Sequence, residues 1–218
     1  MTQKNKEVCI ELVLKLSGTI TVLTTFGIIW VLFSESFSFF KEVSIVEFLT
    51  DNQWTPLFAN KRFGIMPLIS GTLLTTAIAL TVALPLGLSI AIYLSEYAPK
   101  RLRLIVKPLL EMLASIPTVV YGFFALMIVT PFLKTILPNI SGFNALSAGI
   151  VMGIMIIPFI SSMSEDALRS VPKSIREASY GIGATRLQTS FRVMVPAASS
   201  GIIVSVILAF SRAIGETM

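Results

Sequence analysis

Five long apolar stretches, separated by shorter charged segments, dominate this sequence of 218 residues. They cover residues 17–34, 67–94, 108–133, 146–164 and 197–218. At a rise of about 1.5 Å per residue, each is long enough to cross a hydrocarbon layer of about 30 Å as a helix. With 54% hydrophobic and 13% charged residues, the chain is also too apolar for a soluble domain of this size. We therefore predict an all-α transmembrane protein.

The positive charges predict which connections face the cytoplasm. Basic residues gather in two of the connecting segments: Lys100, Arg101, Arg103 and Lys107 in one, and Arg169, Lys173, Arg176, Arg186 and Arg192 in the other. Cytoplasmic loops carry an excess of Lys and Arg, so residues 95–107 and 165–196 should lie inside. Residues 35–66 are acidic on balance and residues 134–145 hold a single lysine, so both should lie outside. Topology therefore accounts for the net charge of +5 without a nucleic-acid partner.

The polar segment before the last apolar stretch has the signals of two short helices joined by a turn. Ser174 and Glu177 have the spacing of a helix capping box. Gly183 is expected to end or bend this first helix. Leu187 and Phe191, four residues apart, mark a second amphipathic stretch. We therefore expect an ordered cytoplasmic element that faces a partner.

The spacing in this segment resembles the EAA loop of ABC-importer permeases. That pattern is Glu-Ala-Ala, three residues, Gly, nine residues, an aliphatic, one residue, an aliphatic and Pro. The matching positions are Glu177, Ala178, Ser179, Gly183, Val193, Val195 and Pro196, with Ser179 in place of the second alanine. In that family the two short helices dock into a groove on the ATPase subunit and pass its movement to the membrane helices. The resemblance thus implies that these are ATPase-coupling residues; an ordinary cytoplasmic helix pair is the alternative.

Other motifs resemble the phosphate-specific ABC permeases of the PstC type. They are Trp54–Pro56, Phe63–Pro67, Gly71–Leu73, Ser115–Phe123 and Ser211–Met218. The resemblance extends over nearly the whole chain from the outer loop onward, and it implies a type I, MetI-like ABC-importer permease bundle.

The family pattern also implies how the chain is organised. The family has a sixth span with a cytoplasmic carboxyl terminus, whereas this sequence stops at Met218, within the fifth apolar stretch. We therefore expect five spans visible of an expected six, in a sequence truncated before the last span. The predicted domains are residues 1–66, the amino-terminal span with its outer loop, and residues 67–218, the ABC permease transmembrane domain.

Two charged residues lie within the last apolar stretch. Arg212 is about 15 residues beyond Pro196, hence roughly 22 Å along a helix from the cytoplasmic end. A guanidinium in hydrocarbon costs about 2.5 kcal/mol or more, so Arg212 should face protein or water. Glu216, four residues later on the same helix face, can form an ion pair with it.

The role of this pair has two interpretations. In one, Arg212 and Glu216 neutralise each other and are structural. In the other, Arg212 offers donors to phosphate oxygens, while Glu216 holds the guanidinium or accepts a proton from hydrogenphosphate. The resembling family places a functional Arg/Glu pair in this segment, which implies that Arg212 and Glu216 are substrate-pathway residues.

The sequence offers little for catalysis or metal binding. It contains no histidine and a single cysteine, Cys9, so imidazole chemistry and an internal disulfide are excluded. It also lacks the Gly-x-x-x-x-Gly-Lys-Ser/Thr phosphate loop of ATPases. We therefore expect no catalytic residue, no metal site and no cofactor bound by this chain, with ATP hydrolysed by a partner subunit.

Together these features predict a permease subunit of an ATP-driven inorganic phosphate importer, in a bacterial or archaeal cytoplasmic (inner) membrane. The resemblance implies a second homologous permease subunit, a cytoplasmic ATPase dimer and an extracytoplasmic phosphate-binding protein as partners. The nearest alternatives are a permease for another oxyanion, sulfate or molybdate, and the paired phosphate permease of the same complex. An ion-coupled secondary transporter or channel, or a membrane-embedded enzyme, would need no ATPase-docking loop.

Overall fold

A computed structural model describes residues 3–217, with the side chains of these residues apart from residues 3–6 and Cys9. The expectations for Cys9 and for Met218 therefore lie outside the described part. Residues 3–217 form helices, turns and loops without a β-strand; one isolated bridge joins Trp54 to Phe63. The chain divides into two compact units, residues 1–68 and 69–218.

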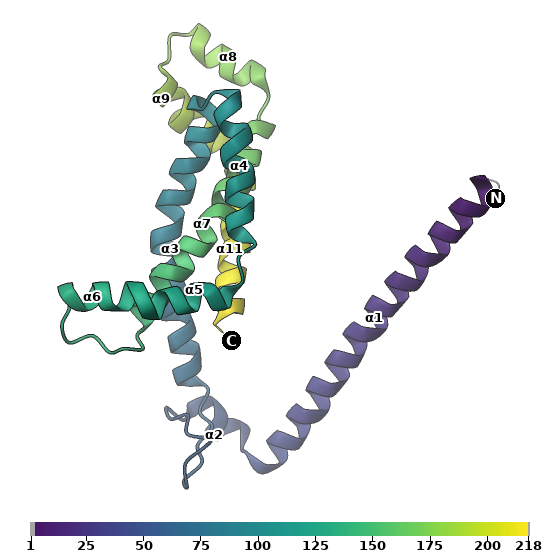
Figure 1. Cartoon of the computed structure of the whole chain (residues 1–218), viewed down its shortest axis with the longest axis vertical. Coiled ribbons are helices and arrows are strands. Elements are labelled where there is room, and N and C mark those ends of the chain that lie inside the picture. Colours follow the sequence, from purple (N-terminus) through teal and green to yellow (C-terminus); the bar gives the residue numbers. More distant parts are fainter. Residues whose placement is uncertain (1–2, 218) are drawn as a thin grey trace. The chain divides into compact units, whose positions relative to one another are not determined.

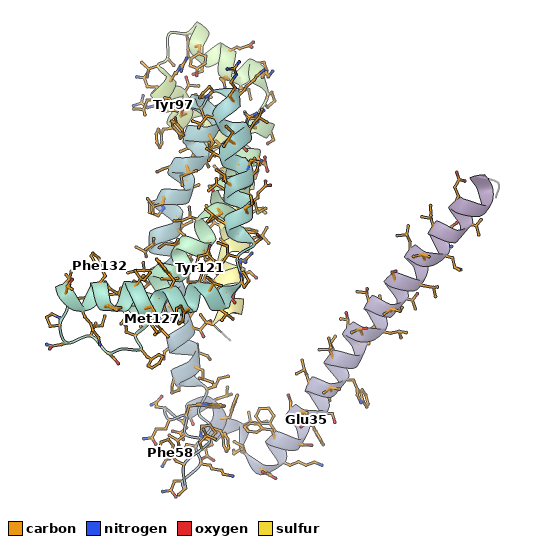
Figure 2. All side chains as sticks on the ribbon, in the orientation of Figure 1. Glu35, Phe58, Tyr97, Tyr121, Met127 and Phe132 are labelled. Carbon is orange, nitrogen blue, oxygen red and sulfur yellow. The ribbon has the colours of Figure 1, made fainter. Side chains whose placement is uncertain are left out.

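The first unit contains two helices followed by a folded loop. They are α1 (Gln3–Glu42), whose side chains project from all sides (Figure 2), and α2 (Ile45–Thr50). Edge-to-face contacts join Phe39, Phe48 and Phe63, with ring centroids 5.4–5.8 Å apart. A Cβ at Gly64 would lie 2.0 Å from the Asp51 carbonyl oxygen, so the loop closes only with glycine there.

The second unit is a bundle of membrane helices with short helices at its ends. The long α3, α4, α7 and α11 run alongside one another, α8 and α9 lie at one end, and α5 and α6 cross the bundle (Figure 1). The elements, in which η denotes a π-helix, are α3 (Met66–Ile92), η1 (Tyr93–Tyr97), α4 (Lys100–Ala114), α5 (Thr118–Phe124), η2 (Ala125–Val129), α6 (Thr130–Ile136), α7 (Ala145–Ser170), α8 (Lys173–Gly181), α9 (Arg186–Thr189), η3 (Ser190–Met194), α10 (Val195–Ala197) and α11 (Ser199–Glu216).

Helix α7 lies at the centre of this unit because small residues let its neighbours approach closely. A Cβ at Gly153 would lie 2.8 Å from the Ala79 carbonyl oxygen of α3, so the two backbones are nearly in contact. On the α11 side, the buried hydroxyls of Ser164 and Ser205 are 2.8 Å apart and share a hydrogen bond. This packing gives α3, α7 and α11 fixed positions relative to one another.

Within residues 3–217, the predicted all-α architecture with five apolar helices is confirmed. The helices long and apolar enough to cross a membrane are Ile10–Glu42, Met66–Tyr97, Thr118–Ile136, Ala145–Ser170 and Ser199–Glu216.

One boundary was wrong. The apolar stretch 108–133 is not one continuous helix, because α4 ends at Ala114 and the third apolar helix begins only at Thr118. Pro117 lacks an amide hydrogen and keeps Ile116 out of helical geometry, which separates the two helices. Because α4 begins at Lys100, the basic residues of the segment 95–107 lie on this helix rather than in a loop.

Candidate coupling surface and substrate pathway

Gly183 ends α8 with a tight left-handed turn, as predicted. Its φ is +85°, the only positive φ in the described part of the chain. The Gly183 amide donates to the Tyr180 carbonyl oxygen at 2.9 Å, and the Ala184 amide donates to that of Ser179 at 3.2 Å. These two bonds form a Schellman motif, which satisfies the last carbonyl groups of α8 and sets the direction in which the chain leaves it.

The capping box lies on the second short helix, not on the first. Helix α8 begins at Lys173 after Pro172, which leaves Ser174 inside the first turn and the predicted Ser174–Glu177 box unformed. On α9, the Thr185 hydroxyl accepts from the Gln188 amide at 3.3 Å, and the Gln188 side chain accepts from the Thr185 amide at 2.9 Å. The Thr-x-x-Gln pattern of this box was already readable in the sequence.

The two short helices are tied together at the position where serine replaces the second alanine of the EAA pattern. The Ser179 and Thr189 hydroxyls are buried and 2.9 Å apart. Val193 and Val195 are half-buried, and Met194 between them packs fully buried against the bundle. Pro196 lies within the short helix α10 (Val195–Ala197). The segment therefore enters the bundle as a nearly continuous helical path.

The segment from the end of α8 to η3 exposes three large apolar side chains. Ile182, Leu187 and Phe191 are 87%, 62% and 56% exposed. Glu177 and Ala178 are exposed on α8 as well. We call the surface of Ile182, Leu187 and Phe191 the docking face. It has the composition of a protein interface on an otherwise polar segment.

A buried carboxylate that sequence reasoning missed fixes α4 to α7 near the same end of the bundle. Glu165 is 1% exposed, and its oxygens lie 3.0 Å from Lys107, 3.6 Å from Arg169 and 3.8 Å from Arg103. Lys107 also pairs with Asp166. Burial alone would lower the pKa of Lys107, but its hydrogen bonds to Asp166 and Glu165 and the attraction of both carboxylates outweigh burial and raise it. The ammonium group therefore stays charged at neutral pH.

Arg212 and Glu216 are brought together, but loosely. Arg212 Nε lies 3.9 Å from Glu216 Oε1, and the two side chains are 34% and 25% exposed. Within the described residues, Arg212 Nε has no hydrogen-bond partner. The guanidinium is thus partly available to another acceptor.

Glu216, rather than Arg212, lines a cavity in the second unit. This cavity has a volume of about 530 Å³ and lies between α5, η2, α7 and the end of α11. Its polar lining includes Thr118, Tyr121 and Asn144, and Tyr121 donates to the Leu113 carbonyl oxygen at 3.0 Å. Tyr121, labelled in Figure 2, also packs against the hydrophobic core.

Comparison with known proteins assigns the chain to a family. A family model described as the binding-protein-dependent transport system inner membrane component matches residues 83–218. The chain belongs to this family. As predicted, it is a multi-pass inner-membrane protein of the ABC-permease type.

The curated relatives of this permease are themselves named permeases. It is 41% identical to the probable ABC transporter permease protein YqgH of Bacillus subtilis, over 81% of this chain and 57% of that protein. It is 39% identical to the phosphate transport system permease protein PstC of Mesorhizobium japonicum, over 78% and 58%. A probable PstC of Methanocaldococcus jannaschii is 34% identical over 73% and 56%. The permease thus spans little more than half the length of these relatives.

A solved structure supports the fold of the permease. A chain of the MetNI methionine ABC transporter, in an inward-facing conformation, aligns with a TM-score of 0.54 and 23% identity. The alignment covers 70% of this permease and 68% of that chain. The predicted type I, MetI-like bundle is confirmed, and so is the predicted resemblance to PstC-type permeases.

The orientation of the permease remains a prediction that labelling can test. In a variant without Cys9, cysteines are introduced at Gly181, which is exposed on α8, and at Leu57, which is exposed in the outer loop. A membrane-impermeant thiol reagent should label Leu57→Cys in intact cells and Gly181→Cys only after permeabilisation. Labelling of Gly181→Cys in intact cells would reverse the orientation.

Proposed function

We propose that this permease is the membrane subunit of an ATP-driven inorganic phosphate importer. The observation that carries the proposal is the 34–39% identity to proteins named as phosphate transport permeases, over about three quarters of the chain. In this proposal the partners are a second homologous permease, a cytoplasmic ATPase dimer and an extracytoplasmic phosphate-binding protein. ATP is hydrolysed by the ATPase partner, and the permease binds no cofactor.

The proposed coupling element is the segment from α8 through α10. Its residues are Glu177, Ala178, Ser179, Gly183, Val193, Val195 and Pro196, with the docking face seated on the ATPase. A folded, exposed apolar surface supports this role, because burying it against a partner is favourable and its internal hydrogen bonds keep its shape. Movement of the ATPase then shifts the helix pair, and the bundle exchanges between outward- and inward-open states.

The proposed substrate pathway includes Arg212 and Glu216. Arg212 offers planar N–H donors to phosphate oxygens. Glu216, at the edge of the 530 Å³ cavity, can accept a hydrogen bond from a protonated oxyanion. Sulfate carries no proton at neutral pH, so an ionised Glu216 would disfavour it relative to phosphate.

Retention of the ATPase tests the proposal. Leu187→Asp with Phe191→Asp places two charges on the docking face and should reduce the ATPase that copurifies with the permease by about tenfold, because charges at an interface core are costly. The matched control is Leu57→Asp with Phe58→Asp, another exposed Leu and Phe, in the outer loop. The control should retain the ATPase.

The outcomes separate the candidate classes of protein. If both double variants retained the same amount of ATPase, the docking face would not be the surface that binds the ATPase. No retention by the unmodified permease, together with transport driven by an ion gradient alone, would favour a secondary transporter. Turnover of a substrate without any partner would favour a membrane-embedded enzyme.

A further inference from the structure

An ion pair joins the first short helix to the cytoplasmic end of the second span. Arg176 Nη2 on α8 donates to Glu96 Oε1 on η1 at 2.7 Å, although the two residues are 80 positions apart in sequence. The Glu96 side chain is 2% exposed, whereas that of Arg176 is about a quarter exposed. The contact is therefore a short, charge-assisted hydrogen bond to a buried carboxylate.

The carboxylate is held in place from its own side as well. It belongs to η1, a single π-helical turn that continues α3, in which the Ala98 amide donates to the Tyr93 carbonyl oxygen at 2.8 Å. The Ser95 hydroxyl is 3.2 Å from Glu96 Oε1. Leu94, in the same turn, is buried. Because its turn is anchored, Glu96 has little freedom to follow Arg176 unless α3 moves too.

Just before this turn in the sequence, α3 is part of the hydrophobic core at this end of the bundle. Ala91 packs in one cluster with Leu168 of α7, Met194 of η3 and Ile202 of α11. The second span is therefore packed against the helices that surround the helix pair. A force on η1 is transmitted into the bundle rather than absorbed by a loop.

The covalent connection to α8 comes from α7, a different span. From α7 the chain passes through Val171 and Pro172 in extended geometry before α8 begins at Lys173. Val171 is buried in the same core cluster as Leu168, so this link holds the start of α8 to the end of α7. The ion pair adds a second attachment, which connects α8 to α3 at a buried carboxylate.

We propose that Glu96 and Arg176 form a positioning pair that makes the second span follow the movement of α8. This inference rests on the proposed function, in which the ATPase moves α8. The physical reason is that separating the pair leaves the buried Glu96 carboxylate without its cation, which is strongly unfavourable. In the ATPase cycle the pair stays together, and the end of α3 moves with α8.

The variants test both sides of the pair. Arg176→Gln and Glu96→Gln each remove one charge while keeping a similar shape, and Arg176→Lys keeps the charge. The matched control is Lys173→Gln, also on α8, whose side chain is exposed and has no ion pair among residues 3–217. Each variant is measured in the transporter assembled with its partners and in the purified permease by itself.

In the assembled transporter, the ATP hydrolysed per phosphate transported should rise by about tenfold in Arg176→Gln and in Glu96→Gln. The double variant should be no worse than either single one, since both remove the same interaction. Arg176→Lys should restore most of the coupling, and Lys173→Gln should match the unmodified protein. The amount of bound ATPase should stay within about twofold throughout. An unchanged ATP-to-phosphate ratio, or a loss of transport that only follows a loss of assembled complex, would overturn the proposal.

Hydrogen exchange in the purified permease separates this inference from the proposed function. The amides of α8 should exchange about fivefold faster in Arg176→Gln than in Lys173→Gln, because α8 has lost its attachment to η1. If the unmodified transporter moves no phosphate, the proposed function fails, and the exchange rates alone decide on the pair. Equal exchange in the two variants would then overturn the pair as a positioning element.

Discussion

Replacing Gly183 with valine is expected to lower phosphate transport per ATP hydrolysed by about tenfold while leaving membrane insertion intact. The reason is the backbone: a φ of +85° costs a residue with a Cβ roughly 1–2 kcal/mol, and β-branched side chains suffer most. A Cβ at Gly183 would meet no atom within 4 Å, so a clash with the bundle is not the cause. The strain falls on the turn that sets the angle between α8 and α9.

The matched control is Gly181→Val, two residues earlier on α8. A Cβ at Gly181 also meets nothing within 4 Å, but its φ is not positive. Coupling is measured as phosphate taken up per ATP hydrolysed, at equal amounts of assembled complex. Normal coupling in Gly183→Val would show that the turn geometry is unimportant for transmission.

Replacing Arg212 with glutamine in the assembled transporter should reduce phosphate uptake by about ten- to a hundredfold. This range corresponds to the loss of charge-assisted hydrogen bonds worth roughly 1.5–3 kcal/mol. Assembly with the partner permease and the ATPase should persist, because the pair with Glu216 is long, at 3.9 Å, and partly exposed. Arg212→Lys should rescue only part of the uptake, since an ammonium group cannot offer two parallel donors.

A structural role for the same pair predicts a different pattern. In that case Arg212→Gln would lower the yield of assembled complex, and replacing Arg212 and Glu216 together by apolar residues would restore yield and uptake. Complex yield and phosphate uptake are therefore measured side by side. Near-normal uptake per complex in the double replacement would remove Arg212 from the pathway.

Much of the sequence-based prediction came from the length of the apolar stretches and from local backbone rules. Apolar length identified five membrane helices, and Gly183 was expected to end or bend the first short helix, which it ends with a positive φ. The third span was misplaced because hydropathy does not register the break that Pro117 imposes within an apolar run. The capping box was misplaced because two segments carry compatible spacings, and Pro172 starts α8 too early for Ser174 to cap it.

The ion pairs between residues far apart in the sequence could not have been predicted. Glu96 and Arg176 are 80 residues apart, and Lys107 and Glu165 are 58 apart, so only the packing of the helices brings them together. The basic residues of α4 and α8 were used only to predict the membrane orientation, and this rule does not identify their side-chain partners. Arg212 and Glu216, by contrast, were predictable as a pair because helical spacing alone places them on one face.

The most direct test of the central claim is transport in lipid vesicles that contain the permease with its second permease and ATPase dimer. ATP is supplied on the side of residues 165–196, and the binding protein with labelled phosphate on the opposite side. The account predicts phosphate accumulation that requires both ATP and the ATPase and persists with an excess of sulfate or molybdate. Uptake driven by an ion gradient without the ATPase, or ATP-driven uptake that prefers sulfate or molybdate, would contradict it.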